Sequence, residues 1–191
     1  MANRVVVDVT KRQVQTTRCR IIPFTYDNNA GLQKSDSKHY LAYRVPMYVV
    51  VVQGGSEYWA LRFGLVNHGE KAPRKERQCD AGLTSARSVQ PPWIGTYSPH
   101  SFTLPGRKGA WQIQQDFLIH QGTDGKSIGG ALGCIEICGP QRWDTFLAEI
   151  ERLAGVPCEE IGKQRLLTVN IEAAAAPMAE MADAVPIPPQ P

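Results

Sequence analysis

The chain has 191 residues, of which 42% are hydrophobic, 20% are charged and 17 are glycine. This length suits one domain with its own core, and the composition is that of a turn-rich globular protein rather than a disordered or fibrous one. The formal net charge of +3 is too small for the electrostatic footprint of a nucleic-acid binder.

The first third of the chain predicts β-structure. Short strands are expected at residues 4–9 and 17–22, where β-branched residues are frequent. The apolar run 48–52 and the alternating run 58–66 are separated by a glycine-containing turn, which predicts a hairpin. Residues 67–109 lose periodicity and predict a long loop with a short strand at 96–102.

The second half predicts more strands and one helix. A strand group is expected at 111–120 and 133–137, with the glycine-rich stretch 122–130 between its parts. Helical spacing of apolar residues and an opening Pro140 predict a helix over about 140–154, and residues 165–171 predict a last strand. The fold expected is therefore mainly β, with a single domain over residues 1–172 and one packed helix.

The remainder of the chain, residues 173–191, is rich in alanine and proline. It contains no aromatic residue. Such a composition predicts an extended or disordered tail, which we exclude from the expected fold.

A histidine and a cysteine flank the glycine-rich stretch. His120 ends an apolar segment and Cys134 begins the next. If the two strands are neighbours, the imidazole can take the thiol proton and produce the nucleophilic thiolate. Gly133 and Gly130 would let nearby backbone amides face a developing oxyanion. The alternative is that Cys134 is a buried core thiol and that His120 merely ends a strand.

Several other residues are candidates for a supporting role. Asp116, Asp124 or Glu136 could orient His120, as could a backbone carbonyl. Cys138 follows Cys134 by four residues and is expected to fill the core, with a resolving thiol as the alternative. The other histidines, namely His39, His68 and His100, are expected to be exposed or to lie in loops.

The five cysteines include no CxxC pair, and no two histidines lie close together along the chain. We therefore expect neither a structural metal nor a cofactor. An odd number of cysteines leaves at least one free thiol in a monomer.

These residues resemble the L,D-transpeptidase catalytic family. The resemblance rests on Ile119-His120-Gln121-Gly122, a glycine-rich stretch, and Gly133-Cys134-Ile135, with a looser match at residues 92–97, and it covers about residues 91–155. It implies a β-sandwich-like core, Cys134 as nucleophile, His120 as base and an acyl-enzyme formed with a peptide of peptidoglycan. Backbone support from Ile135 and substrate or orienting contacts from Gln121, Asp124, Ser127 and Tyr97 are part of the same expectation.

The pattern is most similar to compact relatives of that fold, including antibacterial effectors of contractile secretion systems. An immunity protein or a secretion-apparatus protein is then the expected partner. Residues 1–12 carry neither the apolar core of a secretory signal nor a membrane span. We therefore expect synthesis in the cytoplasm and action in the periplasm or cell envelope after export by a dedicated secretion system, unless a signal has been trimmed.

Two competing interpretations remain open. One is a different cysteine peptidase or amidase, such as a papain-like wall hydrolase, in which the cysteine would precede the histidine. The other is a non-catalytic β-rich binding domain, or a structural domain of a phage or secretion apparatus, with an inert cysteine.

Overall fold

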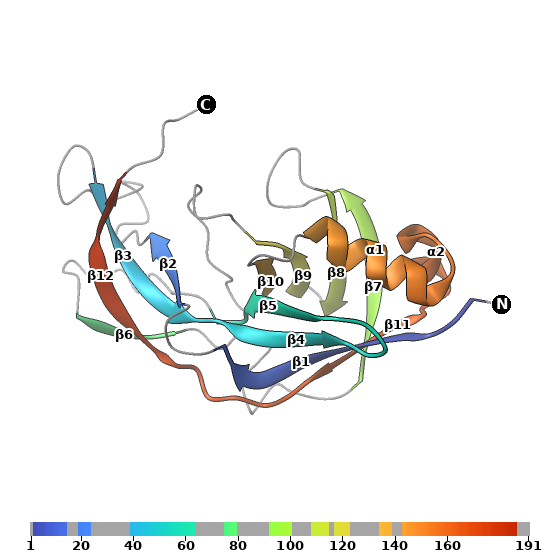
Figure 1. The fold of residues 1–191 in the computed structure, drawn as a ribbon, viewed down its shortest axis with the longest axis horizontal. Coiled ribbons are helices and arrows are strands. Elements are labelled where there is room, and N and C mark those ends of the chain that lie inside the picture. The colour runs from blue at the N-terminus through green and yellow to red at the C-terminus, as the bar shows by residue number, and fades with distance from the viewer. Residues whose placement is uncertain are drawn as a thin grey trace.

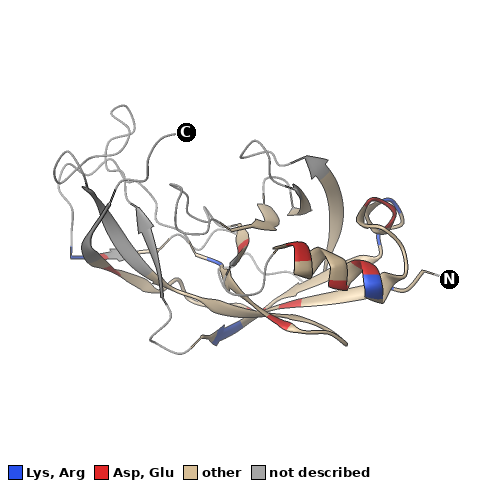
Figure 2. Cartoon of the chain, turned by 45° about the horizontal axis from the view of Figure 1, so that its top comes forward, with Lys and Arg blue, Asp and Glu red and all other residues tan. Residues whose placement is uncertain are grey.

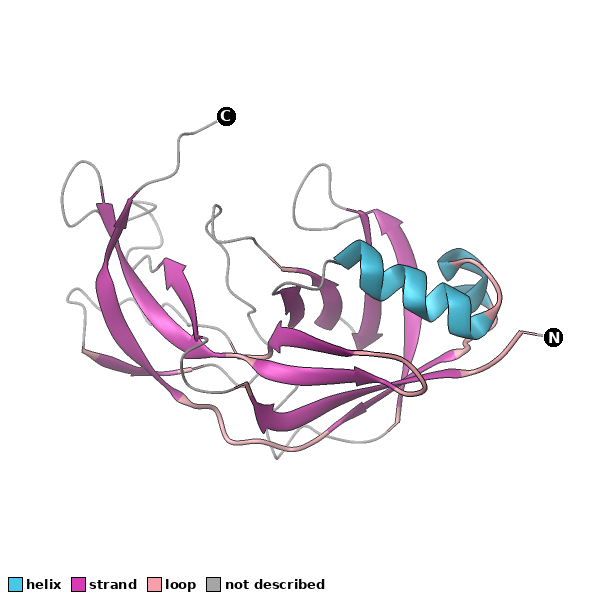
Figure 3. Ribbon diagram, in the orientation of Figure 1, coloured by secondary structure: helices cyan, strands magenta, loops and turns pink. Residues whose placement is uncertain are grey.

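The structure is a computed structural model that describes residues 2–14, 19–23, 39–63, 75–79, 92–100, 108–114, 117–122, 134–138 and 143–186. The predicted mainly β fold is confirmed, because the described residues form two sheets and two helices (Figure 3). The smaller sheet lies at one end of the molecule and both helices lie at the other (Figure 1).

The larger sheet is a closed barrel with the strand order β1-β11-β7-β8-β9-β10-β5-β4. Closure follows from β1, which pairs with β11 in parallel and with β4 antiparallel. The resemblance implied a sandwich-like core, whereas this sheet closes on itself. Its strands are β1 (Val5–Gln13), β4 (Tyr48–Val52), β5 (Glu57–Leu61), β7 (Trp93–His100), β8 (Lys108–Gln114), β9 (Phe117–Gln121), β10 (Ile135–Cys138) and β11 (Leu167–Ile171).

The predicted hairpin is confirmed by β4 and β5, which pair antiparallel around a turn that contains Gly54 with a φ of +76°. The expected strand over 111–120 is in fact two antiparallel strands, β8 and β9, in which Ala110 lies opposite His120. Apolar residues continue through both strands, so composition alone did not mark the reversal between them.

The second sheet has four strands in the order β2-β3-β12-β6. These are β2 (Cys19–Pro23), β3 (His39–Pro46), β6 (Glu76–Gln78) and β12 (Met178–Pro186). The prediction of a disordered tail was wrong for residues 178–186, because β12 pairs with β3 on one side and with β6 on the other. The folded part of the chain therefore extends beyond residue 172, and residues 187–191 lie outside the described residues.

The predicted helix is confirmed as α1 (Trp143–Ala154), and its expected opening at Pro140 lies outside the described residues. Its apolar stripe joins the inward-facing residues of the barrel in one core. A second helix, α2 (Cys158–Lys163), was not predicted because six residues are too short for a periodic stripe. It begins three residues after Gly155, whose φ of +75° ends α1.

A second core lies between the outer side of the barrel and the smaller sheet. Leu61 of β5 packs there with Val45 of β3 and Ala179 of β12. Arg62 is buried at its edge and donates hydrogen bonds to the carbonyls of Thr10 and Glu172. The barrel wall at β5 thus has an apolar layer on each face.

Candidate active site

β9, which carries His120, and β10, which begins one residue after Cys134, are neighbours, and this meets the condition that the sequence set for bringing the two residues together. β9 and β10 pair in parallel, with Ile119 opposite Ile135 and His120 opposite Glu136. Parallel neighbours need a connection of about a dozen residues or more, and residues 122–134 supply one of that length. The sequence did not reveal this parallel sense.

Parallel pairing offsets the two candidate residues along the sheet. Cys134 directly precedes β10, which places it level with Leu118, two positions before His120. A strand spacing of about 4.8 Å and a rise of about 3.3 Å per residue put their Cα atoms about 8 Å apart. Side chains alternate along a strand, so Leu118, His120 and Glu136 share one face of the sheet.

This shared face points away from the barrel interior. Ile119, Ile135 and Ile137 point inward and belong to the barrel core. Glu136 pairs with Leu61 of β5, and Leu61 belongs to the second core. The outer face therefore runs from the second core through Glu136 to His120 and then to Ala110 of β8.

A hydrogen bond to the main chain assigns the tautomer of His120. Its Nδ1 lies 2.9 Å from the main-chain oxygen of Gln121. A carbonyl oxygen only accepts, so Nδ1 must carry the hydrogen, and Nε2 of the neutral ring then holds the lone pair. The orienting group at Nδ1 is thus a backbone carbonyl and not one of the three carboxyl groups that the sequence offered.

The three cysteines whose side chains the structure describes differ in their exposure to solvent. Cys79 and Cys158 are buried and Cys134 is partly exposed, and none of the three forms a disulfide. Burial, followed by the charge of Glu151, raises the pKa of the Cys158 thiol. The alternative of a buried core thiol therefore describes Cys79 and Cys158 better than it describes Cys134. The side chains of Cys19 and Cys138 lie outside the description.

Several predicted supporting residues lie outside the described residues: Gly130, Gly133, Asp116, Asp124, Ser127 and His68. The side chain of Ile135 is fully buried in the barrel core, so only its backbone can serve the site. His39 begins β3 and His100 ends β7, so both lie in strands, and their side-chain exposure lies outside the description.

Tyr97 does not lie on the face of His120. It pairs with Trp111 of β8, and the ring centroids are 4.9 Å apart. Trp111 in turn lies opposite Ile119, so this row of side chains points into the barrel. Burial, with smaller effects from Cys158, Glu159 and Glu151, raises the pKa of Tyr97 to about 12. The expected contact of Tyr97 with a substrate at His120 is therefore not supported by this arrangement.

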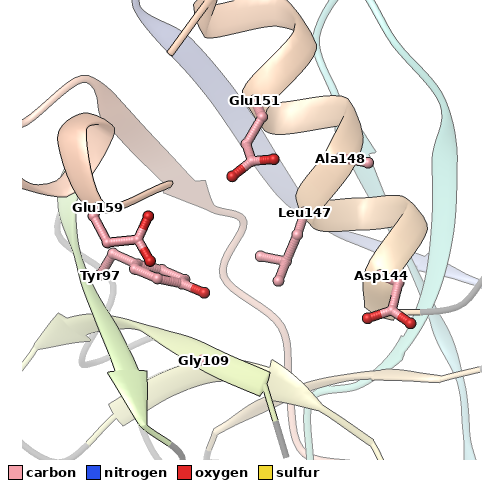
Figure 4. Close-up of a pocket in the computed structure, with 7 residues that line it drawn as sticks. All are labelled: Tyr97, Gly109, Asp144, Leu147, Ala148, Glu151 and Glu159. Atoms are coloured by element: carbon pink, nitrogen blue, oxygen red, sulfur yellow. The ribbon is translucent and has the colours of Figure 1, made fainter. Parts of the chain in front are cut away.

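Tyr97 instead lines a pocket of about 330 Å³ between the helices and the β7–β8 pair, which the sequence did not predict (Figure 4). Leu147 and Glu151 reach into it from α1, and Glu159 of α2 lies beside Tyr97.

Acidic residues recur along both helices (Figure 2). Asp144 and Glu159 lie in first helical turns, where a carboxylate is favoured by the helix dipole, and Glu151 accepts a hydrogen bond from the Cys158 amide at 2.9 Å.

Glu136 is the most unusual polar residue of the outer face. Its exposed fraction is 3%, and its Oε2 has no hydrogen-bond partner among the described residues. It sits between two buried isoleucines of β10, so the sequence Ile135-Glu136-Ile137 already showed a carboxyl group inside an apolar strand. The sequence did not show that Glu136 lies directly opposite His120.

No known protein family matches the chain, and neither a curated protein nor a solved structure matches it. Within the described part of the chain, no three His, Cys, Asp or Glu residues are grouped so that they could hold a metal ion. Neither described helix is both long and apolar enough to cross a membrane.

Proposed function

We propose that the chain is a cysteine-dependent acyl-transfer enzyme that acts on the stem peptides of peptidoglycan. Cys134 is the nucleophile and His120 is the general base. The observation that carries the proposal is the hydrogen bond from His120 Nδ1 to the Gln121 carbonyl, because it leaves Nε2 as a proton acceptor on β9, whose neighbour β10 begins one residue after the partly exposed Cys134.

The chemistry proceeds in two steps. His120 Nε2 takes the thiol proton, and Cys134 Sγ attacks the peptide carbonyl to form a tetrahedral intermediate. The imidazolium returns the proton to the leaving amine, which breaks the peptide bond and leaves a thioester on Cys134. Water or a second amine then attacks the thioester, which releases the thiol and completes hydrolysis or transfer. A Cα separation of about 8 Å is within the combined reach of the two side chains.

The substrate class comes from the resemblance of residues 119–122 and 133–135 to the L,D-transpeptidase family. The same resemblance supports export as an antibacterial effector. The proposal needs β9 and β10 side by side, which the barrel provides, and it does not depend on a sandwich-like core.

The register between β9 and β10 favours one alternative function, that of a non-catalytic binding domain. His120 lies opposite Glu136 and not opposite Cys134. In that interpretation the domain binds a ligand without covalent chemistry at Cys134.

The first experiment incubates the protein with peptidoglycan fragments that carry tetrapeptide and pentapeptide stems, and reads the products by mass spectrometry. We expect cleaved, exchanged or cross-linked products with the wild type and with Cys158→Ala, and none with Cys134→Ala. His120→Gln should lower kcat/KM by about 100-fold or more, the usual contribution of a general base. Circular dichroism checks that each variant is folded.

The rate at which a thiol-reactive probe labels each cysteine tests whether His120 activates Cys134. Cys134 should label faster than Cys158 in the folded wild type, and His120→Gln should remove most of the difference. The proposal is overturned if Cys134→Ala keeps the products, or if no product forms and Cys134 labels no faster in the wild type than in His120→Gln.

A further inference from the structure

We infer that Glu136 is a positioning residue of the proposed site, whose buried carboxylate stabilises the positive charge that His120 gains when it takes the Cys134 proton. The inference rests on the proposed function and adds a third side chain to it. Glu136 acts on His120 and does not touch the substrate.

The first argument is the register of the strands. His120 of β9 lies between Ala110 of β8 and Glu136 of β10, and of these two neighbours only Glu136 can carry a charge. Glu136 is one strand spacing away, at a Cα distance of about 4.8 Å, and on the same face of the sheet. A carboxylate at about 4–6 Å from a histidine favours the protonated, positively charged ring.

The second argument is burial. Glu136 is 3% exposed, and two apolar side chains beside it are buried as well: Leu61, opposite it on β5, and Leu118, two residues before His120. Because these side chains exclude water, the attraction between a carboxylate and an imidazolium is screened less than at the surface. The same burial keeps Glu136 from contacting a bound peptide, so its effect on the reaction passes through His120.

The third argument is an unmet hydrogen bond. Glu136 Oε2 has no partner among the residues that the structure describes. A buried carboxylate without a partner is unfavourable, and this cost is present while His120 is neutral. Once His120 Nε2 has taken the thiol proton, the carboxylate faces a cation that offsets part of the cost. Glu136 thus favours the proton transfer from Cys134 to His120.

The two groups that act on His120 have different tasks. The Gln121 carbonyl, 2.9 Å from Nδ1, fixes the orientation of the ring but carries no charge, whereas Glu136 supplies the charge. Cys134 lies two residues from Glu136 along the strand direction, with their Cα atoms about 6.6 Å apart. The repulsion between Glu136 and the thiolate is therefore weaker than the attraction between Glu136 and the nearer ring.

The direct test is an NMR titration of the His120 ring in full-length Cys134→Ala protein, which lacks the competing thiol. The spectrum of His120→Gln assigns the signal. When Glu136→Gln is added to Cys134→Ala, the ring should take up its proton at a pH about one unit lower, the smallest shift expected for loss of a neighbouring opposite charge. Glu136→Leu should give the same shift, because leucine suits the apolar surroundings and also lacks the charge.

Kinetics tests the role of Glu136 in the reaction. With the Cys134 thiol present, Glu136→Gln should lower kcat on the peptidoglycan peptide by about threefold to tenfold, since one pH unit of basicity corresponds to at most about tenfold. KM should keep its wild-type value, because Glu136 does not contact the peptide. In a His120→Gln background the same change should have no further effect on kcat.

The matched control is Glu159→Gln, which changes an exposed carboxylate of α2 at the pocket on the inner side of the barrel wall. This variant should leave both the His120 titration and kcat unchanged. The inference is overturned if neither Glu136→Gln nor Glu136→Leu moves the His120 titration, or if Glu136→Gln lowers kcat equally in the His120→Gln background.

The titration needs no turnover, so it separates failure of this inference from failure of the proposed function. A shifted titration without any product from the wild type would support the interaction of Glu136 with His120 and overturn the enzyme. Products from the wild type with an unshifted titration would support the enzyme and overturn the role of Glu136. If Glu136→Gln does not fold, the titration of Glu136→Leu decides.

Discussion

Glu149 ties α1 to the turn between β4 and β5, and its replacement tests how the helix is held on the barrel. Its carboxylate accepts hydrogen bonds from the Ser56 amide at 2.9 Å, the Ser56 hydroxyl at 3.0 Å and the Tyr58 hydroxyl at 2.9 Å. The side chain is only 12% exposed. We expect Glu149→Gln to destabilise the protein, because the amide of glutamine presents a donor where an acceptor is needed.

The expected magnitude follows from these contacts. A hydrogen bond to a charged group contributes about 1.5–3 kcal/mol, and glutamine keeps one carbonyl oxygen that can accept part of the set. The free energy of unfolding at pH 7 should therefore fall by about 2–3 kcal/mol. In a protein of this size the midpoint temperature should fall by roughly 5–10 °C.

The effect should depend on pH. Burial alone would raise the pKa of Glu149, but the hydrogen bonds from Ser56 and Tyr58 and the charge of Arg152 outweigh it, so the pKa lies below its ordinary value of 4.5. A depressed pKa in the folded state stabilises the protein above the unfolded pKa, and this stability is lost as the pH falls through the folded pKa. The gap between the wild type and Glu149→Gln should thus be full at neutral pH and narrow below pH 4.5.

Urea unfolding followed by tryptophan fluorescence, at pH 7 and near pH 3.5, measures both effects. The control is Glu160→Gln on α2, a partly exposed residue that forms an ion pair with Lys163 at 3.8 Å and accepts a hydrogen bond from Gln164 at 2.6 Å. That change should cost no more than about 0.5 kcal/mol. The reasoning is refuted if Glu149→Gln matches this control at pH 7, or if the gap does not narrow in acid.

Two further predictions test the fold around the proposed site. Gly109→Ala should lower the free energy of unfolding by about 2 kcal/mol or more, because Gly109 has a φ of +47° and a Cβ there would lie 2.1 Å from the Tyr97 hydroxyl. In a Tyr97→Leu background the cost should fall to the backbone part, about 1 kcal/mol, and an unchanged cost would contradict the clash. Deletion of residues 178–191 should cost about 3 kcal/mol or more in urea unfolding, since it removes β12 and its buried Ala179, whereas a disordered tail would leave stability unchanged.

Local periodicity was enough to predict part of the fold. Phe146 and Ile150 recur at helical spacing, and both are fully buried in α1. The β4–β5 hairpin followed from two β-prone runs around a short glycine-containing turn. In both elements the chain satisfies its backbone hydrogen bonds with near neighbours, so short stretches of sequence contain the information.

Elements that depend on distant partners were not predictable in this way. β12 contains three alanines and two acidic residues, which have low strand propensity, and it is held by pairing with β3 and β6, which lie far from it along the chain. Closure of the barrel likewise depends on β1 meeting β11. Such long-range pairings can hold a segment as a strand even where its own sequence has a low strand propensity.

The candidate site, like the fold, could be predicted from the sequence only in part. The sequence showed that pairing His120 with Cys134 requires two neighbouring strands, but it did not show that β9 and β10 are parallel, because the direction depends on the path of the connection and not on local pattern. The relative direction of the two strands decides which side chain lies opposite His120. An antiparallel pair would have brought the two ends of the connection together, whereas the parallel pair brings Glu136 to His120 and moves Cys134 two positions away.

The closed barrel also separates two acidic regions that the sequence could not distinguish. Because side chains alternate, the row through Tyr97 and Trp111 points inward, and the row through Glu136 and His120 points outward. The pocket that Tyr97 and Glu159 line therefore lies on the other side of the barrel wall from His120 and Glu136, so a substitution in one region leaves the lining of the other unchanged.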